Sequence, residues 1–281
     1  CEKLVIRFQL HHLSYLRHPC QLYVQDFQRF SMRLKEKFMN KLVLIDGNSL
    51  INRAFYATPP LSAKDGTPTN AVYSFVNMLV KLIGDAKPEY ILVAFDRHEP
   101  TFRHVAYADY KATRKPMPED LRPQIDLLKT VLDTMKIARF EKAGIEADDI
   151  IGTLAKRYKF ETIIITGDKD SFQLVDETTS VYFTRRGISD TEIYSAENFK
   201  EKTGIEPLQV IDLKGMMGDS SDNIPGITGV GEKTAKSFIE KYGSLENLYA
   251  HVGDLSGKRT RRGVERDCFH VKVACNDRYF G

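Results

Sequence analysis

The stretch EADDIIGTLA, residues 146–155, places three carboxylates within four positions at the predicted start of a helix. Two unit charges about 5 Å apart at an effective dielectric of about 20 repel by roughly 3 kcal/mol. One explanation for Glu146, Asp148 and Asp149 is a helix start, since acidic groups there complement the helix dipole by roughly 0.3–1 kcal/mol each. The other is a cation site. If the acids form a cation site, this helix start is strained in the absence of metal. Asp149→Asn should then raise the melting temperature of the protein in metal-free buffer.

Six further acidic residues lie in motifs that could reach the same site. Three of them end short apolar runs, which are KLVLID (41–46), YILVAFD (90–96) and TIIITGD (162–168). Ligands of open parallel sheets bind beyond the carboxyl ends of the strands, so Asp46, Asp96 and Asp168 should converge. Each alone would suit a turn or a helix cap equally well. The other three, in GDKDSF and MMGDSSDNIPG, are Asp170, Asp219 and Asp222.

Nine carboxylates cannot share one dry pocket without cations. Hard divalent ions prefer oxygen ligands, so the predicted cofactor is Mg²⁺ or Mn²⁺ in two or more copies. All four cysteines lie outside residues 21–267, which argues against a cysteine zinc site there. Two divalent ions about 4 Å apart serve phosphodiester hydrolysis, and one of them acidifies a bound water. The absence of a P-loop pattern argues against an NTP-driven enzyme.

The stretch TFRHVAYADYKATRKPMPEDLR, residues 101–122, interleaves basic and aromatic side chains. Basic groups contact phosphates and aromatic faces stack on unpaired bases, although a solvated helix with core aromatics would show the same pattern. Lys111 and Arg114 are three residues apart, so a helix would place both on one face, over a scissile phosphate. Pro116 and Pro118 would break such a helix, which favours an arch over the site.

The sequence PGITGVG, residues 225–231, lies between a helix predicted from Pro207 to about Met217 and another from Glu232 to Tyr242. Its glycines permit positive φ and close approach of a ligand to the backbone. The N–H groups that begin the second helix would face phosphate oxygens, and Lys233 adds positive charge. A tight turn between packed helices is the alternative.

Alternating strands and helices must position these groups. Helical patterns at 69–84, 118–135 and 146–158 separate the three apolar runs, which predicts a mostly parallel α/β sheet covered by helices. The hydrophobic fraction of 42% can build a core, and the net charge of +3 restricts any nucleic-acid contact to a local basic patch. There is no apolar run of 18 residues and no signal-peptide pattern, so we expect a cytoplasmic protein without membrane contact.

The two ends differ from the middle in being rich in arginine and lacking periodicity. Met39 directly precedes the first strand, so we expect residues 1–38 to be a non-native or mistranslated extension, with a targeting arm as the alternative. Residues 259–281 are expected to be an unmatched, possibly frameshifted tail. Between the ends we expect a catalytic core at 39–203 and a DNA-binding module at 204–258.

Residues 39–258 resemble the 5′ nuclease domains of bacterial DNA polymerase I, in the flap endonuclease (5′–3′ exonuclease) family. The matching motifs are LIDGNSLINRAFYA, ILVAFD, TFRHVAYADYKATR, EADDIIGTLA, TGDKDSFQLV, IDLKGMMGDSSDNIPGITGVGEKTA and KYGSLENLY. The resemblance implies a PIN-like mostly parallel sheet with flanking helices, followed by a helix–three-turn–helix (helix-hairpin-helix) module.

The resemblance also implies a function: a metal-dependent, structure-specific 5′–3′ exonuclease and flap endonuclease that acts on DNA with a 5′ flap, a nick or an RNA primer. We expect a monomer, associated with the bacterial nucleoid and without polymerase activity. The alternatives are a non-catalytic DNA-binding module, an RNA-directed PIN-type nuclease and a defective, truncated nuclease fragment.

The family's functional positions carry over onto matching residues of this sequence. One implied set of metal ligands is Asp46, Asp96, Glu146, Asp148 and Asp149, and the second is Asp168, Asp170, Asp219 and Asp222. The implied contacts to the substrate phosphate and the unpaired 5′ strand are Arg53, Phe102, Arg103, Tyr110, Lys111 and Arg114. Of these, Lys111 and Arg114 are expected to stabilise the charge that develops on the phosphate. The hairpin of 226–231, with Gly226, Gly229 and Gly231, matches the family's contact to a monovalent cation and the duplex backbone.

Overall fold

A six-stranded sheet forms the centre of the computed structural model, which describes residues 40–186, 190–255 and Val264. The strand order is β3-β2-β1-β4-β5-β6, and every neighbouring pair is parallel except β5 and β6. The strands are β1 (Lys41–Asp46), β2 (Tyr90–Phe95), β3 (Ala138–Glu141), β4 (Glu161–Thr166), β5 (Thr179–Arg186) and β6 (Asp190–Tyr194). The predicted mostly parallel α/β fold is confirmed. The expected non-native ends lie outside the described residues, apart from Val264.

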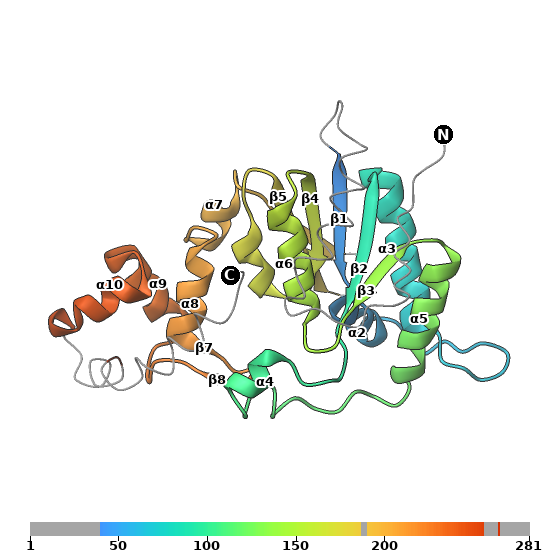
Figure 1. Ribbon diagram of the computed structural model, residues 1–281, viewed down its shortest axis with the longest axis horizontal. Helices are drawn as coiled ribbons and strands as arrows, with labels where there is room; N and C mark the ends of the chain where they lie inside the picture. The colour runs from blue at the N-terminus through green and yellow to red at the C-terminus, as the bar shows by residue number, and fades with distance from the viewer. Residues whose placement is uncertain (1–39, 187–189, 256–263, 265–281) are drawn as a thin grey trace, which may run out of the picture.

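Helices flank both faces of this sheet (Figure 1). One layer contains α2 (Gly47–Ala57), α3 (Asn70–Ala86) and α5 (Arg122–Thr134). The other contains α6 (Ala147–Arg157), the 3-10 helix η1 (Lys169–Leu174) and α7 (Phe199–Thr203). Successive strand side chains point to opposite faces, so Val43 and Ile45 join the first layer and Leu42 and Leu44 join the second. Full burial of such a side chain contributes about 1.5–3 kcal/mol, which fixes the strand ends relative to both layers.

The segment after β2 is mostly turns. Only the short helix α4 (Phe102–Ala106) is regular, and Lys111 has a positive φ of 58°. The expectation that a helix would place Lys111 and Arg114 on one face is therefore wrong. Hydrogen bonds hold the segment instead: the Lys111 backbone N–H donates to the Asp222 carbonyl at 2.9 Å, and the Asn223 side-chain amide donates to the Asp109 carbonyl at 2.8 Å. We call residues 101–122 the arch.

The C-terminal part contains the predicted pair of helices, α8 (Gln209–Met217) and α9 (Glu232–Tyr242). Two short strands, β7 (Gly218–Asp219) and β8 (Ile224–Pro225), follow α8, and α10 (Leu245–Ala250) and η2 (Val252–Asp254) follow α9. A Cβ at Gly226 would collide with the backbone of Met217 and Gly218, and Gly229 has φ 84°. The helix–hairpin–helix order is confirmed, and its core is continuous with the second helical layer. None of the helices in the described ranges is long and apolar enough to span a membrane.

Candidate active site

The three aspartates predicted at strand ends also cap or link the elements that follow. Asp46 is the N-cap of α2 and accepts from the Ser49 N–H at 2.9 Å and from the Thr166 hydroxyl at 3.0 Å. Asp96 accepts from the Ala147 N–H at 2.7 Å, which ties the end of β2 to the start of α6. Asp168 caps η1. These structural roles are compatible with a ligand role, because each carboxylate keeps lone pairs beyond those used by these hydrogen bonds.

Asp148, in the first turn of α6, completes what we call the deep cluster: Asp46, Asp96, Asp148 and Asp168. Burial, with the charges of Asp46, Asp168 and Asp96, raises the pKa of Asp148 well above its usual range. Burial and Asp96 raise the pKa of Asp46 to about 7, and burial and Asp170 raise that of Asp168 to about 6. Burial also raises the pKa of Asp96. The four carboxylates are therefore crowded, desolvated and mutually repulsive.

The chemistry of the deep cluster fits a divalent cation. None of its members forms an ion pair with a Lys or Arg of the described chain, and the buried Oδ1 of Asp148 has no hydrogen-bond partner there. Hard cations take such oxygens and would offset both desolvation and repulsion. Within residues 40–186 and 190–255, no three His, Cys, Asp or Glu side chains stand in a preformed metal-binding arrangement. The carboxylates would therefore have to close around an ion.

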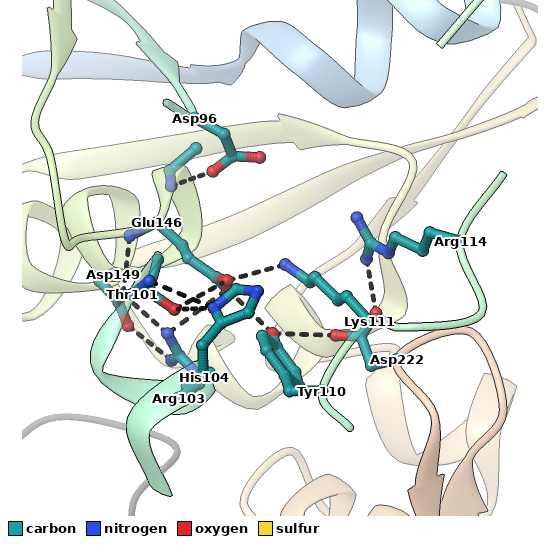
Figure 2. A network of polar contacts seen from close by, with 11 residues as sticks. Asp96, Thr101, Arg103, His104, Tyr110, Lys111, Arg114, Glu146, Asp149 and Asp222 are labelled. Atoms are coloured by element: carbon teal, nitrogen blue, oxygen red, sulfur yellow. Dashed lines mark hydrogen bonds and ion pairs between the residues drawn. The ribbon is translucent and has the colours of Figure 1, made fainter. Parts of the chain in front are cut away.

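The remaining five predicted ligands differ from the deep cluster because cationic side chains lie against them. We call them the paired rim: Glu146, Asp149, Asp170, Asp219 and Asp222. The arch supplies cations for three of them (Figure 2). The Lys111 ammonium lies 2.8 Å from Glu146, and the Arg114 guanidinium contacts Asp222. The Tyr110 hydroxyl lies within hydrogen-bond distance of both of these carboxylates, at 3.0 and 3.1 Å.

Asp149 is held by a two-nitrogen contact with Arg103 and by a backbone N–H. Arg103 binds it through two nitrogens, at 2.9 and 2.7 Å, and also lies 3.4 Å from Glu146. The Glu146 N–H donates to the same carboxylate at 3.0 Å, which completes a capping box at the start of α6. The geometry gives Asp149 and Arg103 a clear structural role, namely to hold the helix that carries Asp148.

A lysine that sequence reasoning missed lies on the other side of the rim. The Lys214 ammonium, on α8, lies 2.7 Å from Asp170 and 2.8 Å from Asp219. Asp219 also accepts from the backbone and hydroxyl of Ser221. Burial acts to raise the pKa of Asp219, but Lys214 and Ser221 outweigh it and hold that pKa well below its usual range. The helix ends between positions 214 and 219, so no periodicity connects the pair in the sequence.

The other predicted DNA contacts are spread around this site. Arg53 donates to the carbonyls of Gly167 at 2.6 Å and Arg185 at 3.2 Å, so it braces the end of β4. Phe102 is 44% exposed and stays accessible to a base, with the Arg103 guanidinium 4.5 Å from its ring centre. Gly231 and Lys233 are exposed at the start of α9, where no neighbour would meet a Cβ on Gly231.

Comparisons with known proteins identify the family of the chain. A family model described as 5′–3′ exonuclease, N-terminal resolvase-like domain, matches residues 41–204, and one described as 5′–3′ exonuclease, C-terminal SAM fold, matches residues 205–274. The chain is 49% identical over 228 residues to DNA polymerase I of Bacillus subtilis (strain 168) and 46% identical over 229 residues to that of Bacillus caldotenax. Each alignment covers 80% of this chain and 26% of the relative, so the chain spans about a quarter of their length.

Solved structures share the fold. The bacteriophage T5 5′-exonuclease with bound divalent metal ions (zinc) superposes with a TM-score of 0.68 at 22% identity, over 83% of this chain and 87% of that one. A bacteriophage T5 flap endonuclease in a pseudo-enzyme-product complex with DNA and metal ions gives 0.67 at 22% identity, with the same coverage. At this identity the likeness concerns the arrangement of helices and strands.

Proposed function

The chain belongs to the 5′–3′ exonuclease family, and from this premise we propose that it hydrolyses phosphodiester bonds at 5′ ends and 5′ flaps of DNA. The observation that carries the proposal is the deep cluster: four aspartates from four segments converge without a cationic partner in the described chain. A protein that only binds DNA gains nothing from such charge, because it repels phosphates.

Divalent cations are the proposed cofactors, Mg²⁺ or Mn²⁺ in two or more copies. The deep cluster would hold them together with members of the paired rim, and the metal ions in the two T5 structures support this assignment. When bound, such ions neutralise the carboxylates, polarise the phosphodiester and acidify a water. The chain's own task is to hold the carboxylates at the strand ends, which the caps of α2, η1 and α6 accomplish.

Lys111 and Arg114 are the proposed groups that receive the scissile phosphate. Both already contact rim carboxylates, and Arg114 has 49% of its side chain exposed. Each can exchange its carboxylate for a phosphate oxygen and so keep a charge-assisted contact. Arg103 and Tyr110 are buried beneath them and support the arch, whereas the exposed ring of Phe102 is placed to stack on an unpaired base.

The substrate is proposed to be DNA with a 5′ flap, a nick or an RNA primer, bound by a monomer. We assign the catalytic core to residues 39–203 and the duplex contact to 204–258. The exposed start of α9 presents backbone N–H groups and Lys233 to duplex phosphates, and the hairpin of 226–231 is the proposed monovalent-cation site. The hydrogen bonds of the arch to Asp222 and Asn223 support this proposal, because they join the proposed contact of the unpaired strand to the module proposed to bind the duplex.

The direct test is cleavage of a labelled 5′-flap duplex by the full chain in Mg²⁺. Asp96→Asn and Asp168→Asn should abolish cleavage while flap binding persists, since both remove charge from the deep cluster. Asp126→Asn, at an exposed position of α5, is the matched control and should cleave like wild type. A ribonucleotide flap tests primer removal on the same duplex. Undiminished cleavage by both cluster variants would refute the assigned site.

A further inference from the structure

Lys214 joins two carboxylates that come from different parts of the molecule. Asp170 belongs to η1, which follows the sheet, whereas Asp219 belongs to β7, which follows α8. The ammonium lies 2.7 Å from Asp170 Oδ1 and donates to Asp219 Oδ2 at 2.8 Å, with 20% of the lysine side chain exposed. A single positive charge therefore stands between two members of the acid set that the resemblance assigns to one metal ion.

Both carboxylates favour the charged form of this ammonium, because each has an oxygen within 2.8 Å of it. The lysine thus partly neutralises two of the four acids in the set, Asp170 and Asp219. Asp222 has Arg114 instead, and Asp168 forms no ion pair in the described chain.

We propose that Lys214 sets the affinity of Asp168, Asp170, Asp219 and Asp222 for a divalent cation by competing with that cation for Asp170 and Asp219. The inference rests on the metal site of the proposed function. A divalent cation would bind the same two carboxylates that the ammonium contacts, and two cations held on one carboxylate pair repel each other. Binding of the ion must therefore displace the lysine or proceed against its charge.

The competition gives the site two properties. Without metal, Lys214 bridges η1 and β7, so the rim stays assembled. With metal, the cation replaces that bridge, and its binding is weakened by the loss of the two lysine contacts. The deep cluster has no such lysine in the described chain, so cations held mainly by Asp46, Asp96 and Asp148 should bind more tightly. Two classes of divalent-cation affinity follow.

The test measures Mn²⁺ binding to the full chain without DNA. The electron paramagnetic resonance signal of free Mn²⁺ and calorimetry report the binding. In wild type we expect a tight and a weak class. Lys214→Met keeps the length of the side chain and removes its charge, so the dissociation constant of the weak class should fall about tenfold at an unchanged stoichiometry. Lys214→Arg keeps the charge and should bind Mn²⁺ like wild type.

Lys169→Met is the matched control, because this exposed lysine is the neighbour of Asp168 and Asp170 in the sequence but forms no ion pair with either in the described structure. It removes the same charge and should change the weak class by much less. Lys214→Gln also removes the charge but retains a hydrogen-bond donor. It should lower the dissociation constant of the weak class in the same way, and it replaces the methionine variant if that variant fails to fold without metal. Weak-class affinity that is unchanged or lower in Lys214→Met and Lys214→Gln would overturn the proposal. Wild type that binds no Mn²⁺ would overturn the proposed metal site as well.

Discussion

The deep cluster and the paired rim contain the same kind of side chain in one region, yet the protein treats them differently. The deep aspartates accept hydrogen bonds from N–H and hydroxyl groups only, and their pKa values are raised. Each rim acid has Arg103, Lys111, Arg114 or Lys214 against it. The nine predicted ligands are therefore not one crowded set: the protein supplies cations to five of them and forms no Lys or Arg ion pair with the other four in the described chain.

This difference predicts that neutralising substitutions in the two groups change the stability of the metal-free protein in opposite directions. Neutralising a deep acid removes repulsion and desolvation from the metal-free fold, which should become more stable. Neutralising a rim acid breaks an ion pair and should make that fold less stable. The expectation from the sequence that Asp149→Asn would raise the melting temperature does not fit the structure, because Asp149 is paired with Arg103 and caps α6. The strained position of this helix start is Asp148.

The largest expected effect is the loss of cleavage in Asp148→Asn. Loss of a residue behind a metal ligand usually costs about 10–100-fold, so loss of a ligand should exceed about 100-fold. The same variant should melt higher than wild type in EDTA, whereas Asp149→Asn should melt lower. Flap cleavage in Mg²⁺ and thermal melts in EDTA measure the two effects, with Asp126→Asn as the control. A lower melting temperature for Asp148→Asn in EDTA would remove the distinction between the two groups.

Arg103→Ala should have the largest effect on stability. It leaves Asp149 and Glu146, which are 16% and 8% exposed, without the guanidinium that pairs them. Breaking a buried pair by removing one partner costs about 3–5 kcal/mol. Urea denaturation in EDTA measures the loss, and Arg157→Ala, exposed at the end of α6, should lie within about 0.5 kcal/mol of wild type. A loss below about 1 kcal/mol would mean that the rim pairs are weak surface contacts.

The pH dependence of metal-free stability should report the deep cluster. Unfolded aspartates titrate near 3.8, whereas burial with neighbouring carboxylates raises the pKa of Asp46 to about 7 and that of Asp168 to about 6. Between these values the folded state binds more protons than the unfolded state, so the free energy of unfolding falls as the pH rises. Asp219 has a depressed pKa and acts oppositely, but its contribution is lost only as the pH falls below about 4.

In EDTA the protein should therefore melt a few degrees higher at about pH 5.5 than at about pH 7.5. Saturating Mg²⁺ at the higher pH should reverse the difference, since cations replace the protons. Asp46→Asn should reduce the difference in EDTA, whereas Asp126→Asn should leave it unchanged. Scanning calorimetry at both pH values provides the measurement, and a melting temperature that rises with pH in EDTA would contradict the raised pKa values.

Much of the fold could be predicted from local patterns. The strands at β1, β2 and β4 are continuous apolar runs, and α3, α6 and α9 begin within a residue or so of the predicted helices. The strands β3, β5 and β6 were not predicted. Their sequences, ARFE, TSVYFTRR and DTEIY, carry charged side chains because β3 and β6 are edge strands and β5 pairs with one of them. An edge strand buries less, so its hydrophobic signal is weak.

The convergence of the acids at the strand ends followed from the parallel sheet, but their division into two groups did not. That division depends on cations from the arch and from α8, and their positions are set by tertiary contacts. Lys111 reaches Glu146 because its backbone turns with positive φ, and Lys214 reaches Asp170 because α8 packs on η1. Neither contact has a fixed sequence spacing, so no periodicity could reveal it.

Arg114→Ala should have the smallest effect on stability. It therefore distinguishes Arg114 from Arg103 among the cations that pair with the rim. Its partner Asp222 is 15% exposed, but the Arg114 side chain is 49% exposed, and such pairs usually contribute no more than about 1 kcal/mol. The urea midpoint in EDTA should stay close to that of wild type, and added salt should abolish the remaining difference. Flap cleavage should nevertheless fall, by about 100-fold if Arg114 contacts the phosphate as charge develops. Arg103 would then be the cation that the fold requires, and Arg114 the one that is free to leave its carboxylate for the substrate. A large loss of stability with cleavage retained would instead give Arg114 the same structural role as Arg103.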